Sequence, residues 1–197
     1  MMRFANMIIL ACLLSLAGLA LEADDVTEAI NEGMKYYQQG EYSQAIESLS
    51  YANQLIKQKK GGQLEAFLPQ PLPGWEADDA VSSAAGEALF GGGVVVERNY
   101  YKDDASVHIQ IVTDSPLLTS VMMMMSNPMF ATSDGGKMEK IGGQKALVKY
   151  TESDRSGEVQ VVVNNRYLVT VDGYSVSLDN LRNYTAAINF DGIMKLQ

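Results

Sequence analysis

Short segments rich in valine, isoleucine and tyrosine, joined by brief polar turns, constrain this fold more than any other feature of the sequence. Val94–Tyr101 and Ser106–Thr113 lie on either side of the turn Lys102-Asp103-Asp104. The other segments of this kind are 138–141, 144–151, 158–163 and 166–171. Strands joined by so few residues pair antiparallel, and the Asn164-Asn165 pair tolerates the positive φ of a two-residue hairpin turn. The pattern therefore predicts a mainly antiparallel sheet of about six strands.

Helical segments interrupt and follow these strands. We expect helices at 77–89, from about residue 115 to 126, and at 178–188, with a last turn at 190–196. Pro116 suits the first position of the second of these helices, and Asp114 or Ser115 can cap it. The order predicts an α+β fold in which helices flank the sheet, with Trp75 as a core anchor. In element order this domain is similar to the Mog1/PsbP-like sandwich, a likeness of architecture that carries no functional motif.

The preceding residues, 24–60, predict a helical hairpin. Val26–Gln39 contains no breaker except Gly33, and Tyr42–Lys59 has apolar residues at helical spacing. Gly40 lies between the two segments as a helix stop, and Gly61-Gly62 is expected to end the second helix.

This hairpin resembles a single tetratricopeptide repeat, a helix-turn-helix unit of about 34 residues. The matching small, aromatic and turn positions are Gly33, Tyr36, Gly40, Tyr42, Ala45 and Ala52, and Leu49 matches the large position where the helices cross. The resemblance covers residues 26–57 and implies a docking element, because repeats of this kind stack on neighbours to bury their apolar faces. An amphipathic helical hairpin that belongs to no repeat family is the alternative.

Three prolines separate the hairpin from the sheet. Pro69, Pro71 and Pro73 favour extended backbone, with Gly74 directly after them. The sequence therefore predicts a linker at 61–74 and an α+β domain at 75–197.

The first residues predict a secretory signal at 1–23. Arg3 precedes an apolar run from Met7 to Leu21, and small residues at Ala20 or Ala23 suit cleavage. The run is shorter than the roughly 20 residues that span a bilayer, so we expect no stable membrane span after its removal. The mature protein is expected to be periplasmic or extracellular, with lipid attachment at Cys12 as the disfavoured alternative.

The net charge is -9. Nucleic acids and anionic membranes select for lysine and arginine, so this balance argues against both as partners.

Residues suited to catalysis are few. The only histidine, His108, is expected on the strand face opposite Val107, Ile109 and Ile111. The glycine pairs precede strands or turns rather than helices, which argues against a phosphate-binding loop. Acidic pairs such as Asp103-Asp104 lie where solvated carboxylates are common. We therefore expect a protein that is not an enzyme and has no cofactor and no bound metal.

A run of methionines at 122–125 is the unusual feature. Core packing and a partner contact are two interpretations of these methionines. The third is a ligand or metal site at Met122, Met125 and Met129, because thioethers suit Cu(I).

The leading interpretation is an exported interaction or assembly protein of the cell envelope. It would bind a protein partner or a second copy through the hairpin, using Tyr36, Tyr37 and Tyr42, because tyrosine is enriched at interfaces.

Overall fold

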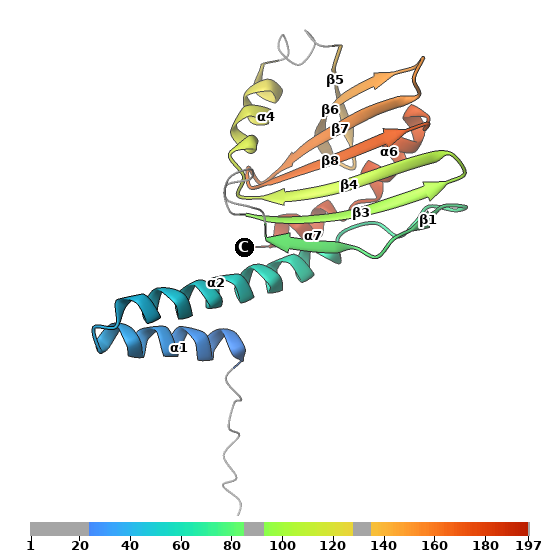
Figure 1. Cartoon of the computed structure of the whole chain (residues 1–197). Helices are drawn as coiled ribbons and strands as arrows, with labels where there is room; N and C mark the ends of the chain where they lie inside the picture. The colour runs from blue at the N-terminus through green and yellow to red at the C-terminus, as the bar shows by residue number, and fades with distance from the viewer. Residues whose placement is uncertain (1–23, 85–92, 128–134, 197) are drawn as a thin grey trace, which may run out of the picture. The chain divides into compact units, whose positions relative to one another are not determined.

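The computed structural model describes residues 24–84, 93–127 and 135–196, and these fall into two compact units that divide between Ala52 and Asn53 (Figure 1). The predicted signal, residues 1–23, lies outside the described residues, as does Met129.

The first unit contains helix α1 (Asp25–Gln38) and the beginning of helix α2 (Tyr42–Glu65). Asp24 caps α1, since its Oδ1 accepts a hydrogen bond from the Thr27 N–H at 3.0 Å. Gly40, with φ of +76°, makes the turn between the helices. The predicted helical hairpin is therefore present in the structure.

Helix α2 corrects one expectation. Gly61-Gly62 does not end the helix, which continues to Glu65. Leu64 and Leu68 then belong to the main core of the second unit, so the stretch predicted as a linker at 61–74 is largely part of that unit. The reason is packing, because the gain from burying two leucines exceeds the cost of two glycines in a helix.

The second unit is built on an antiparallel sheet. Its strands are β1 (Glu76–Ala77), β2 (Val81–Ala84), β3 (Val94–Lys102), β4 (Ala105–Thr113), β5 (Lys137–Ile141), β6 (Gln144–Thr151), β7 (Ser156–Val163) and β8 (Tyr167–Tyr174). Their spatial order is β1-β3-β4-β8-β7-β6-β5, and β2 also pairs with β3. The predicted fold class is confirmed, with eight strands instead of about six.

The two additional strands replace part of an expected helix. Residues 77–89 were expected to be helical, but β1 and β2 occupy their beginning and pair with β3. Hydrogen bonding to β3 stabilises the strand conformation here more than the weak helix propensity of this segment stabilises a helix.

One face of the sheet carries the main core. Helices α6 (Leu178–Ala187) and α7 (Phe190–Lys195) cover it and lie behind the sheet in Figure 1. Trp75 is buried there as expected, with its ring 5.1 Å from that of Tyr184. Gly173 leaves space for two other core side chains, because an added Cβ would lie 2.5 Å from a Val176 methyl carbon and 2.7 Å from one of Leu181.

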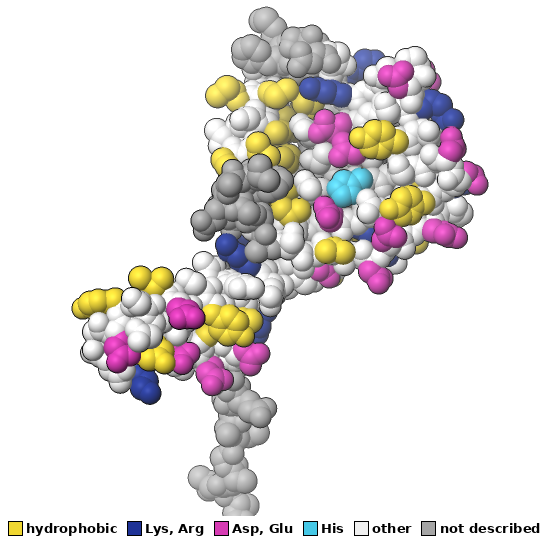
Figure 2. All heavy atoms as spheres, viewed as in Figure 1, with side chains coloured by type: hydrophobic (Ala, Val, Ile, Leu, Met, Phe, Trp, Pro, Cys, Tyr) yellow, Lys and Arg dark blue, Asp and Glu magenta, His cyan; other side chains and the backbone are white. Residues whose placement is uncertain are grey.

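The opposite face is covered only in part among the described residues. Helix α4 (Leu117–Ser126) packs Leu118 and Val121 against Leu168 of β8. The remaining described part of this face is open and carries mainly polar side chains (Figure 2).

Candidate functional site

Small side chains fill the contact between the two helices of the hairpin. Ala29 and Gly33 of α1 are buried, and so are the α2 residues Ala45, Ser48 and Ala52. An added Cβ at Gly33 would lie 2.8 Å from Leu49 Cγ, so the helices approach closely where glycine leaves space. Leu49 lies over Gly33 at this contact, and the other large exposed apolar side chains of the hairpin lie outside it.

These large side chains form an exposed layer that we call the apolar surface. Its residues are Ile30, Met34, Tyr37, Tyr42, Ile46 and Leu49, and all are exposed. On α1 the spacing is i, i+4 and i+7, and the same spacing recurs on α2, so each set occupies one flank of its helix. The rings of Tyr37 and Tyr42 lie 5.8 Å apart, which joins the two sets.

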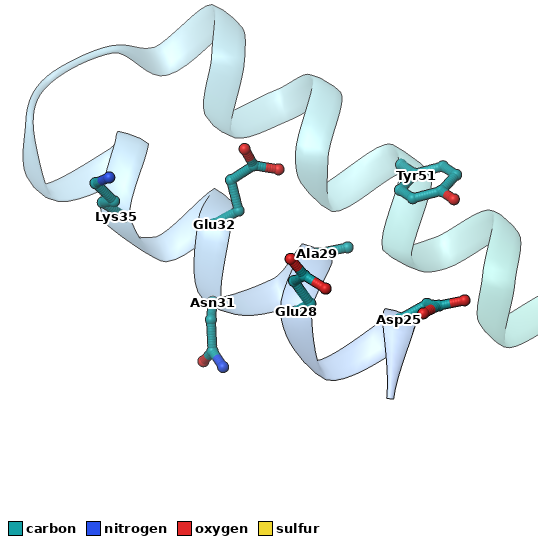
Figure 3. Close-up of a pocket in the computed structure, with 7 residues that line it drawn as sticks. All are labelled: Asp25, Glu28, Ala29, Asn31, Glu32, Lys35 and Tyr51. Atoms are coloured by element: carbon teal, nitrogen blue, oxygen red, sulfur yellow. The ribbon is translucent and has the colours of Figure 1, made fainter. Parts of the chain in front are cut away.

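The other flank of the hairpin is acidic. A shallow pocket of about 560 Å³ lies there between α1 and α2 (Figure 3). Its lining residues are Asp25, Glu28, Ala29, Asn31, Glu32, Lys35 and Tyr51. Glu32 also accepts a hydrogen bond from the Ser48 hydroxyl at 3.3 Å. The hairpin therefore separates its apolar side chains from most of its charge.

The structure brings together two of the three tyrosines proposed for docking. Tyr37 and Tyr42 lie on the apolar surface, whereas Tyr36 is half-buried. Sequence reasoning placed Leu49 at the helix crossing, where its side chain lies against Gly33, and did not single out Ile46 as a surface residue. The sequence shows that Ile30, Met34 and Tyr37 share one flank of a helix. It does not show whether that flank is exposed, because this depends on which small residues form the contact between the helices.

A second candidate lies on the open face of the sheet. His108 is there, opposite the buried Val107, Ile109 and Ile111, as the alternation predicted. Its Nδ1 donates to Asn99 Oδ1 at 2.7 Å, and its Nε2 lies 3.8 Å from a Glu97 carboxylate oxygen. Figure 2 shows the histidine in cyan near acidic side chains on this face.

Two carboxylates stand directly opposite each other beside this histidine. Glu158 of β7 pairs in register with Asp172 of β8, which pairs with His108 of β4. Burial raises the pKa of the Asp172 carboxyl, Glu158 raises it further, and His108 opposes the shift. A shallow pocket of about 370 Å³ lies over this pair, with Lys149, Thr151 and Tyr174 among its lining residues.

The methionine helix gives a weaker candidate. Met125 packs against Leu118, Val121 and Leu168, which accounts for its position as core filling. Met122 is half-buried, and Met123 is the exposed member at 64 %. Because Met129 lies outside the described residues, copper binding by Met122, Met125 and Met129 stays a prediction.

Two further features are absent from the described residues. No helix in this part of the chain is long and apolar enough to cross a membrane. Among the same residues, no three His, Cys, Asp or Glu side chains are grouped so that they could hold a metal ion.

Comparison with known proteins gives no match to any family model, curated protein or solved structure.

Proposed function

We propose that this chain is an exported, non-enzymatic interaction or assembly protein of the cell envelope that docks through the apolar surface of its hairpin. The observation that carries the proposal is the distribution of side chains in the hairpin. Small residues are buried between the helices, while Tyr37 and Ile46 are 66 % and 67 % exposed. Contiguous exposed apolar side chains of this kind mark interaction sites on soluble proteins.

The pattern of exposure also fits the resemblance to a single tetratricopeptide repeat. One repeat cannot bury both sides of its helices, and stacking against a neighbour supplies the missing cover. Tyrosines add large contact area at a low entropic cost, since each fixes only two side-chain torsions.

The test is site-specific photocrosslinking of the full chain in its own cells. A benzophenone amino acid at Tyr37 should form covalent adducts, whereas the same group at Tyr51, on the acidic flank and 54 % exposed, should form few. Equal crosslinking at both positions would refute a docking role for the apolar surface.

Export is tested separately on protein from the envelope fraction. N-terminal sequencing should find a chain that begins between Leu21 and Asp24. A chain that still begins at Met1 would contradict export with cleavage.

A further inference from the structure

The apolar surface and its surroundings also indicate which partner suits it. We propose that the occupant is a second copy of this chain, with two hairpins packed face to face around a two-fold axis as a four-helix bundle. The inference rests on the proposed docking function and adds the identity of the partner.

The first argument is the distribution of charge on the hairpin. Residues 24–52 contain six acidic residues and one lysine. Asp25, Glu28 and Glu32 line the pocket on the acidic flank. Exposed positions along the outer edge of the apolar surface carry Thr27, Gln38, Ser43 and Ser50, none of which is charged.

This distribution decides between two kinds of partner. A basic amphipathic helix would need carboxylates along the edge of the apolar surface, where oppositely charged groups could meet. The hairpin has uncharged residues there instead. A second copy presents the same uncharged edge, and face-to-face packing directs both acidic flanks outward, so two acidic hairpins can meet without opposing their charges.

The second argument is shape and symmetry. Two antiparallel helices with an apolar layer on one flank form half of an antiparallel four-helix bundle. Most homo-oligomers have two-fold symmetry, in which the same patch serves both subunits. The Tyr37–Tyr42 contact and the Ile46 side chain then lie inside the bundle, where large apolar groups gain most from losing water.

The test is sedimentation equilibrium of the full chain purified after export, at concentrations from 1 µM to about 100 µM, a range typical for moderate affinities. The wild type should be a dimer in this range. Ile46→Glu places a carboxylate in each half of the interface and should weaken dimerisation by roughly a hundredfold or more. Tyr51→Glu, on the acidic flank, is the matched control and should leave the dimer intact. Because Tyr51 is exposed and lies outside the proposed interface, Tyr51→Glu should leave thermal unfolding unchanged. Ile46 is also exposed, so Ile46→Glu should lose only the stability that dimerisation supplies, and this loss should grow with protein concentration.

A charge-pair experiment then tests whether the two copies meet at this surface. A chain with Tyr37→Glu and Ile46→Glu and a chain with Tyr37→Lys and Ile46→Lys should each be monomeric. Mixed at low salt, they should form a heterodimer at least about tenfold more tightly than either self-associates. Native mass spectrometry distinguishes the mixed species by mass.

The outcomes separate this inference from the proposed function. A monomeric wild type at about 100 µM, or a dimer broken by Tyr51→Glu and kept by Ile46→Glu, overturns the two-fold bundle. If that monomer still forms crosslinks at Tyr37 to a different protein, docking stands and only the identity of the partner is wrong. If Tyr37 forms no crosslinks at all, both proposals fail.

Discussion

Asp172 occupies a position in the sheet where its neighbours do not stabilise a negative charge. Burial disfavours its charge most, and the carboxylate directly across from it belongs to Glu158, where like charges are also destabilising. His108 on the other side offsets this in part. Asp172 therefore lowers the stability of the folded protein when it is ionised.

Replacing Asp172 with Asn should stabilise the protein by about 0.5–1 kcal/mol at pH 7, because it removes the like-charge pair. The raised pKa of Asp172 exceeds the unfolded value of about 3.9, so the folded chain holds the proton more tightly and stability falls as pH rises through the folded-state pKa. Urea unfolding of both proteins at several pH values measures the difference. The stability gained by Asp172→Asn should shrink as pH falls towards 4. Groups with a lowered pKa, such as Asp114 and Glu139, change the stability of both proteins equally with pH and so cancel in the comparison.

Asp104→Asn in the β3–β4 turn is the control and should change little, since this acid is exposed. An equal gain from both substitutions would show that total charge, not the Glu158–Asp172 pair, is responsible.

Elements defined by local pattern could be predicted from the sequence. Both strands of the Asn164-Asn165 hairpin are present, and both asparagines have positive φ. The β3–β4 hairpin and helices α4 and α6 also lie close to their expected bounds. These elements follow from turn chemistry and side-chain alternation, which are local properties.

Features that depend on distant partners could not be predicted. Ser82 and Ser83 form a strand because β3 offers an edge to pair with. At the candidate site, Leu49 lies over Gly33 of the other helix and is still 44 % exposed, a position that neither helix reveals by itself.

The two glycines within α2 give a matched pair of substitutions. Gly62→Ala should stabilise the protein by about 0.5–1 kcal/mol, because nothing lies within 4 Å of an added Cβ and alanine favours a helix. Gly61→Ala should destabilise it by about 1–3 kcal/mol, because its Cβ would lie 2.6 Å from the Ser82 Cβ. Chemical denaturation of both variants measures the effects. If both stabilise, α2 does not pack on β2 at Gly61.

At the scale of the whole molecule, the boundary between the units determines which fragment folds. Residues 53–197 should unfold cooperatively, because this fragment keeps Leu64 and Leu68 in its core. A fragment of residues 69–197, which begins within the predicted linker, loses both and should be less stable by several kcal/mol, since each deleted core leucine costs about 2–5 kcal/mol. Thermal unfolding followed by circular dichroism compares them. Equal stability would place the boundary at the prolines after all.

The position of β8 has a consequence for when the chain can fold. Among the described strands it comes last in sequence, yet it lies between β4 and β7 and joins the two halves of the sheet. Until residues 167–174 have emerged from the ribosome, the β3–β4 and β5–β7 hairpins have no common partner, and such long-range pairing is slow to form. A nascent chain of this design would stay loosely structured until β8 has emerged. Because we propose that this chain is exported, such a delay would favour export of a chain that has not yet folded.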